Sequence, residues 1–176
     1  MKKLLSVVLA ILMIATAIPV VSLPAFAADG YNGTPVRPIK ITDSNWADLG
    51  LKEKKFVGYY AIRNASELYG FAEYIEETRD YTANVVLLND IVINENMDNP
   101  QYKWDPIIVF CGNLEGNGCT ISGLWVDRGD YGYGGLFLSV GAPGLNSDRT
   151  ISNLTIANSK IKADYSAGAI AGSLGG

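Results

Sequence analysis

The chain has 176 residues, with 14 basic, 18 acidic and no histidine side chains. The lack of imidazole excludes a Ser-His-Asp or Cys-His nucleophile, and two cysteines alone do not make a zinc site. Without the two lysines of the leader described next, 12 basic and 18 acidic residues leave a formal charge of −6, which argues against nucleic acid and anionic membranes as partners.

Residues 1–27 have the features of an export signal. Two lysines precede an apolar run over residues 4–21, and Ala25-Phe26-Ala27 is a small-x-small cleavage sequence before Ala28. The run is also near the length of a membrane span, which is the alternative interpretation. We predict cleavage before Ala28, and a secreted or cell-surface protein without a membrane segment after cleavage.

Residues 28–57 form a lead segment that begins rich in Gly, Pro, Asn and Thr. Such residues bury little surface and indicate a flexible or edge-wrapping start. Trp46, Leu49 and Leu51 are expected to anchor an N-terminal cap, with a loosely ordered segment as the alternative.

A helix is predicted over residues 65–79. Asn64 offers a side-chain cap and Glu67 follows three residues later, at capping-box spacing. One face of this helix is apolar at positions i, i+3, i+4 and i+7: Leu68, Phe71, Ala72 and Ile75. Gly70 is expected to weaken the helix slightly.

Short strands are predicted after the helix. Residues 84–93 are rich in β-formers but contain Asn89-Asp90, which indicates two strand pieces joined by a bend. Residues 112–118 supply Gly and Asn for a tight turn with positive φ. If this turn is a hairpin, Cys119 pairs near Glu115.

An internal repeat follows. The phrase at Thr120–Val126 recurs 30 residues later at Thr150–Ile156, and a small-residue run at Gly135 recurs 33 residues later at Gly168. These offsets are typical of stacked solenoid units, each of which buries its apolar face on its neighbours. We therefore predict a mainly β fold, a partial right-handed parallel β-helix or solenoid with one N-terminal capping α-helix.

Residues 58–176 contain a series of short motifs in this order: Tyr60-Ala61-Ile62, Val86-Leu87-Leu88-Asn89-Asp90-Ile91, Trp104-Asp105-Pro106-Ile107, residues 112–118, Gly135-Leu136-Phe137 and residues 167–172. In their order and spacing, these motifs resemble the β-helix-like region of bacterial surface proteins that carry GLUG repeats. Similar sequences precede the catalytic domain of immunoglobulin A1 metallopeptidases. The chain departs from the pattern in Cys111 and Cys119, and in ending after about one and a half repeats.

The resemblance implies an exported cell-surface or wall-associated repeat module that acts as a structural stalk or adhesion scaffold, with no catalytic residues and no cofactor. The alternatives are the N-terminal non-catalytic region of a larger secreted enzyme, a peptidase or a polysaccharide-degrading enzyme, and a carbohydrate-binding module. The expected partners are glycans or proteins of the cell wall or of a host surface. An open last rung exposes unpaired backbone, so further repeats or domains of the same protein are expected, and the chain alone is expected to be a fragment or unstable.

The candidate ligand-binding residues lie at the end of the first copy of the repeat and between the two copies. Trp125, Tyr131 and Tyr133 could stack on sugars, and partly buried packing is the alternative for Trp125. Asp127 and Asp130 are close enough in sequence to share a bound calcium ion, although no regular spacing supports a metal site. Cys111 and Cys119 could form a disulfide or remain two buried thiols, and the sequence leaves both open.

Overall fold

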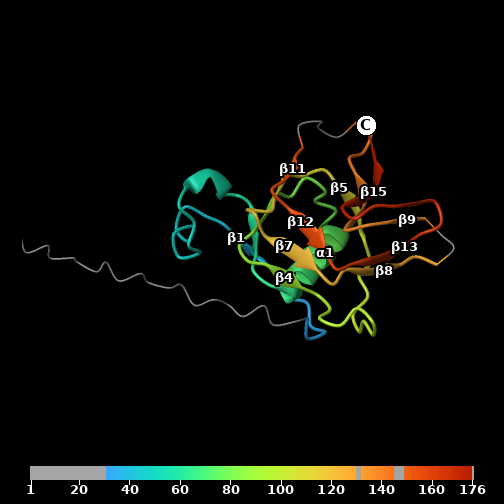
Figure 1. The fold of residues 1–176 in the computed structure, drawn as a ribbon. Helices are drawn as coiled ribbons and strands as arrows, with labels where there is room; N and C mark the ends of the chain where they lie inside the picture. Colours follow the sequence, from blue (N-terminus) through green and yellow to red (C-terminus); the bar gives the residue numbers. More distant parts are fainter. Residues whose placement is uncertain (1–30, 130–131, 145–148, 176) are drawn as a thin grey trace, which may run out of the picture.

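The computed structural model describes residues 31–129, 132–144 and 149–175. It is mainly β, with short strands in several sheets and one α-helix in these ranges (Figure 1). The predicted mainly β class is thus confirmed. No helix in the described ranges has both the length and the hydropathy needed to span a membrane.

Within these ranges the helix and strands fall into four successive groups, which we call passes, and corresponding strands of neighbouring passes lie side by side. They follow a lead segment with strand β1 (Ile39–Lys40) and the short 3-10 helix η1 (Lys54–Phe56). The first pass comprises β2 (Tyr60–Ile62) and α1 (Ala65–Thr78). The second comprises β3 (Val85–Leu87), β4 (Ile91–Val92) and β5 (Ile107–Phe110). The third comprises β6 (Leu114–Glu115), β7 (Thr120–Ser122), β8 (Trp125–Asp127), β9 (Tyr133–Gly134) and β10 (Phe137–Val140). The fourth comprises β11 (Ile151–Ser152), β12 (Thr155–Ala157), β13 (Lys160–Lys162), β14 (Ser166–Ala167) and β15 (Ala171–Leu174).

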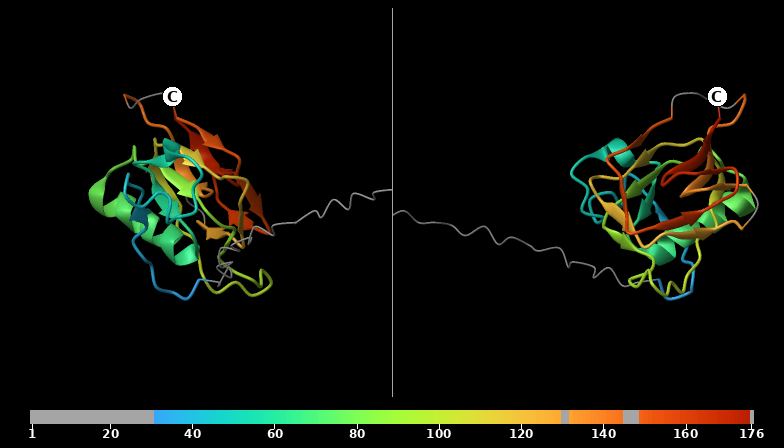
Figure 2. Two further views of the ribbon diagram at one scale, coloured as in Figure 1. Left: turned by 90° about the vertical axis from the view of Figure 1, so that its left-hand side faces the viewer. Right: turned by 45° about the vertical axis from the view of Figure 1, so that its right-hand side comes forward.

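Corresponding strands of successive passes pair in parallel. One sheet has the order β1-β2-β3-β6-β11, in which only β1 is antiparallel to its neighbour. The others are β4-β7-β12, β5-β10-β15, β8-β13 and β9-β14. In the left view of Figure 2, α1 and the red strands of the fourth pass lie on opposite sides of the molecule, with the intermediate passes between them.

The pairing corrects the 30-residue alignment of the repeated phrase. Thr120 pairs with Thr155, 35 residues later, while Ile151 of the second copy pairs with Leu114, 37 residues earlier. The equivalent Thr-Ile-Ser strands of the two copies, β7 and β11, therefore lie in different sheets. Their similarity is misleading because the connection between β11 and β12 is shorter than the one between β6 and β7. The 33-residue offset of the small-residue run is confirmed, since Gly134 pairs with Ala167.

The expected hairpin at residues 112–118 is wrong. Strands β6 and β7 pair with other passes and not with each other, so this segment is a corner between two sheets. The predicted positive φ is confirmed at Asn117 (54°) and Gly118 (79°). Gly116 is required for a different reason: a β-carbon there would overlap the carbonyl oxygen of Asn153 in the next pass.

The predicted strand bend and helix are both confirmed. Strands β3 and β4 flank Asn89-Asp90. Helix α1 begins after Asn64, whose side chain accepts a hydrogen bond of 2.9 Å from the backbone N–H of Glu67. The Glu67 carboxylate in turn accepts from the backbone N–H of Arg63 at 2.8 Å and forms an ion pair with its guanidinium. This reciprocal capping is the local signal that the sequence carried.

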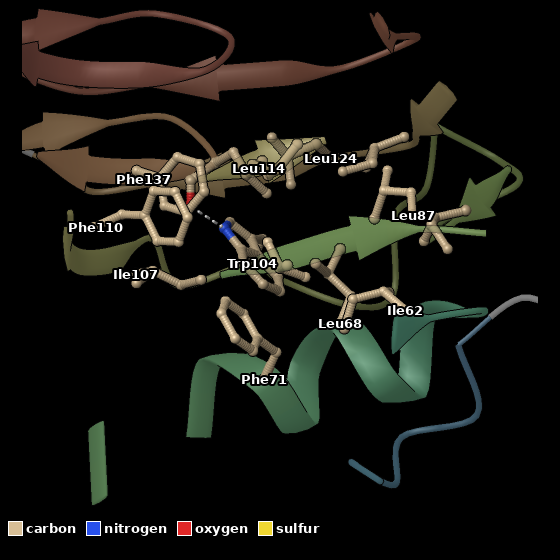
Figure 3. Packing of buried hydrophobic residues seen from close by; sticks show 14 of the residues in the cluster. Ile62, Leu68, Phe71, Leu87, Trp104, Ile107, Phe110, Leu114, Leu124 and Phe137 are labelled. Carbon is tan, nitrogen blue, oxygen red and sulfur yellow. Dashed lines mark hydrogen bonds between the residues drawn. The ribbon is translucent and has the colours of Figure 1, made fainter. Parts of the chain in front are cut away.

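The apolar face of α1 forms the base of the core. Phe71 lies beneath Trp104, and the Trp104 indole N–H donates to the carbonyl oxygen of Leu136 in the third pass at 3.0 Å (Figure 3). Phe110 and Phe137 stack with ring centroids 4.4 Å apart, which joins the second pass to the third. The core is therefore continuous from the helix through three passes.

The lead segment covers the other side of the first sheet. Trp46, Leu49 and Leu51 are partly buried against a small cluster formed by Ile41, Ala61 and Val86. These contacts agree with the anchoring role predicted for the three residues.

Polar side chains at the corners join neighbouring passes. Asn84 accepts from the backbone N–H of Asn113 at 2.7 Å, and the Asn113 side chain accepts from the backbone N–H of Thr150 at 2.9 Å. Asp90 accepts from the backbone N–H of Thr120 at 2.7 Å. Each bond satisfies a donor that the strand ladders leave free.

Glu115 is the charged member of this set. Its carboxylate accepts hydrogen bonds from the side chains of Asn153 (2.9 Å) and Ser152 (3.1 Å) in the fourth pass, and from the backbone N–H of Asn117 (2.7 Å). Burial raises the pKa of Glu115, but these bonds and the charge of Lys55 outweigh it, so that the pKa lies below its ordinary value of 4.5.

We expect Gly70→Ala to destabilise the protein by about 1 to 3 kcal/mol, the usual range for overpacking. Helix propensity alone would favour alanine by about 1 kcal/mol. However, the added β-carbon would overlap the carbonyl oxygen of Val36, where the lead segment crosses the helix. Urea unfolding of the chain from Ala28 to Gly176 measures the change, with Glu76→Ala on the exposed face as the control. A stabilised Gly70→Ala variant would contradict the packing argument.

We expect Glu115→Gln to lower the melting temperature more at pH 7 than at pH 3. The lowered folded-state pKa means that ionised Glu115 adds stability above its unfolded-state pKa. This stability is lost as the pH falls through the folded-state pKa. Thermal unfolding at both pH values tests this, with the exposed Glu76→Gln as the control. An equal loss at both pH values would assign the effect to shape and not to charge.

Candidate functional site

Three of the five predicted ligand-binding residues lie on strands β8 and β9. Figure 1 shows β8, β9 and β13 on the same side of the molecule. Trp125 and Asp127 belong to β8, and Tyr133 belongs to β9. Two other predicted residues, Asp130 and Tyr131, lie outside the described residues.

Tyr133 and Tyr165 form an exposed aromatic pair at successive passes. Their ring centroids are 6.0 Å apart, and the residues are 38% and 74% exposed. Tyr133 can occupy its place because residue 172 of the neighbouring strand is glycine: a β-carbon there would lie 2.6 Å from that of Tyr133. The pair therefore presents ring surface to solvent beside the β9-β14 ladder.

Trp125 and Asp127 flank the buried Val126 on β8, so they point to the outer face of the sheet. Trp125 is half-buried, as the packing alternative predicted. The Asp127 carboxylate accepts a hydrogen bond of 2.9 Å from the backbone N–H of Gly129 and thereby shapes the following turn. This explains Asp127 without a ligand.

The face formed by Tyr133 and Tyr165 provides contact surface. Exposed tyrosine rings have an apolar body and a polar tip, which suits stacking on a sugar ring. In the part of the chain that the structure describes, no three Asp, Glu, Cys or His side chains are grouped closely enough to hold a metal ion.

Cys111 and Cys119 are free thiols in the structure, Cys111 buried and Cys119 half-buried. Cys111 follows β5 and Cys119 precedes β7, on opposite sides of β6 and the corner described above. Burial, and to a smaller extent the charge of Asp90, raises the pKa of the Cys119 thiol. A raised pKa keeps the thiol protonated and weakly nucleophilic at neutral pH.

A cavity that the sequence analysis missed lies away from these residues. It has a volume of about 300 Å³ and is formed by the connection between β4 and β5, together with Tyr31. The available signal was the polar run Asn94-Glu95-Asn96-Met97-Asp98-Asn99, which interrupts an otherwise apolar stretch. Such a run is also typical of an ordinary surface loop, so the sequence alone could not identify a cavity.

Comparison with known proteins gave one informative similarity. The chain is 37% identical over 92 residues to halomucin of Haloquadratum walsbyi; the match covers 51% of this chain and 1% of halomucin. The chain thus corresponds to a very small part of that relative. No family model matches the chain, and no solved structure matches it.

Proposed function

We propose that the chain is an exported module that begins a parallel β-helix and serves as a structural stalk or adhesion scaffold at the cell surface. It is non-catalytic in this proposal. The observation that carries the proposal is the parallel, in-register pairing of corresponding strands over successive passes. Each pass presents its backbone to the next in the same orientation, which is how a solenoid extends.

Side-chain burial supports a stack that grows in one direction. Ile121 of the third pass is fully buried, whereas Ile156, its partner in the fourth pass, is half-buried. The same holds for Val126 and its partner Ile161. The fourth pass thus has an apolar inner face that a further layer would cover. At the other end, the antiparallel strand β1 and the lead segment cover the first sheet.

Location is supported by sequence. The leader has the features of an export signal, and the resemblance to GLUG-repeat surface proteins implies the same compartment. The similarity to a short stretch of the very long halomucin chain is compatible with a module of a large surface protein.

The β-helix part of the proposal predicts unequal costs for the same substitution in adjacent passes. Ile121→Ala should lower the free energy of unfolding by about 2 to 5 kcal/mol, as is usual for a buried isoleucine. Ile156→Ala should cost less than half as much, because this side chain is already half-exposed. Urea unfolding measures both. Equal losses would contradict an open fourth pass.

The surface role predicts that the protein of native cells is recovered from the envelope or the medium, with Ala28 at its N-terminus. A variant with Ala25→Asp and Ala27→Asp should remain unprocessed, because a small-residue cleavage site is lost. Cell fractionation and N-terminal sequencing test this, with a cytoplasmic enzyme as the marker of lysis. Recovery of wild-type protein with the cytoplasmic marker would overturn the proposal.

A carbohydrate-binding module is the second candidate, and the exposed Tyr133–Tyr165 pair is what favours it. A sedimentation assay with purified cell-wall polysaccharide separates the stalk from the carbohydrate-binding module. If the protein is a stalk, the Tyr133→Ala/Tyr165→Ala double variant should sediment with purified cell-wall polysaccharide to the same extent as the wild type.

A further inference from the structure

The cavity at the β4–β5 connection is built around a buried amide. Asn94 is 5% exposed and uses its whole side-chain amide internally. Its Nδ2 donates to the carbonyl oxygens of Tyr102 (2.7 Å) and Gly123 (2.9 Å), and its Oδ1 accepts from the backbone N–H groups of Gln101 and Tyr102, both at 2.9 Å. The Nζ of Lys160 on β13 also donates to the carbonyl oxygen of Met97. The loop is thus held at its base and at its tip.

Tyrosine rings form the apolar wall of the cavity. Tyr31 stacks on Tyr69 with ring centroids 3.9 Å apart and meets Tyr102 edge-on at 4.9 Å. Tyr69 in turn meets Trp104 edge-on, and its hydroxyl donates to the carbonyl oxygen of Lys103 at 3.0 Å. Figures 1 and 2 show the blue segment that begins at Tyr31 beside the yellow-green loop. The wall is therefore continuous with the core and fixed before any ligand arrives.

The polar rim, in contrast, has unused hydrogen-bonding groups. Glu95, Asn99 and Gln101 line the cavity and are exposed. Within the described part of the chain, their side chains make no hydrogen bond or ion pair. The amides each offer donors and an acceptor, and the carboxylate offers acceptors. The cavity thus combines Ile93 and two tyrosine rings with five polar side chains. Polar groups held in place on a rigid frame are what fix the orientation of a small ligand and give its site specificity.

We propose that this cavity binds one neutral saccharide unit of a larger glycan. The volume is at the lower end of ligand sites, which suits a single ring. Vicinal hydroxyl groups both donate and accept hydrogen bonds, as do the amides of the rim. Glu95 and the nearby Asp98 disfavour phosphate or carboxylate ligands. The proposal goes beyond the stalk role and does not depend on it, since the cavity lies wholly within the second pass and the lead segment.

Nuclear magnetic resonance tests the proposal. The chain from Ala28 to Gly176, labelled with ¹⁵N, is titrated with the methyl glycosides of glucose, galactose, mannose and N-acetylglucosamine. We expect at least one glycoside to shift the backbone amide signals of residues 95–102. Asn99→Ala and Gln101→Ala should each weaken that binding about fivefold, the effect of about 1 kcal/mol for one lost hydrogen bond. Both side chains are exposed, so the fold should be retained, and an unchanged melting temperature verifies this.

Two matched variants make the result specific. Tyr165→Ala removes an exposed ring from the other candidate face and should leave the affinity unchanged. Glu95→Gln keeps an acceptor but removes the charge, and should change the affinity for a neutral sugar by less than threefold. The proposal is overturned if no glycoside shifts residues 95–102, or if the shifts map to Tyr133 and Tyr165 instead. It is also overturned if Glu95→Gln abolishes binding while Asn99→Ala and Gln101→Ala do not, because the site would then select positive charge.

Discussion

The structure depends on parallel, in-register pairing between successive passes of the chain. Strands of two to four residues are too short to be stable by themselves, but from β2 onward each is bonded to the corresponding strand of a neighbouring pass. Polar side chains at the corners reinforce the same contact: Asn84, Asn113 and Glu115 bond to backbone or side-chain groups one pass further on. Short strands therefore survive because they are stacked, and the stability of each pass depends on its neighbour.

This constraint separates the parts of the chain that can vary from those that cannot. Inward residues must fit the pass above and the pass below, as Trp104 does through its contact with Leu136. Connections between strands only have to return the chain to the next ladder. The longest described connection within a pass, between β4 and β5, is the one that carries the cavity. The exposed tyrosine pair likewise lies at the edge of the short β9-β14 ladder. The cavity is thus supported by the stack without forming part of a ladder, whereas the tyrosine pair includes Tyr133 of β9 itself.

Features that depend on contacts within a few residues were predictable from the sequence, whereas features that depend on contacts between distant residues were not. Helix α1 was predictable because its cap, Asn64 with Glu67, and its apolar face are contained in one segment. The bend at Asn89-Asp90 was predictable for the same reason. The repeat was misaligned because Thr-Ile-Ser fits any strand that precedes a corner, so the phrase marks a type of position and not one sheet. Gly70 was judged only as a residue within a helix, whereas its role is set by Val36, which is distant in sequence.

By itself, the sequence determined the mainly β character, the position of the one described helix and the exclusion of histidine-based chemistry. These follow from composition and from periodicities within a few residues. Only the tertiary structure decided which strands pair, that Glu115 bonds to Asn153, and that Tyr31 closes a cavity beside Gln101 and Tyr102. These contacts join residues far apart in the chain, and their register depends on the lengths of the intervening corners. The physical reason is that a corner shorter by two residues shifts every later partner while leaving the local pattern of the strands unchanged.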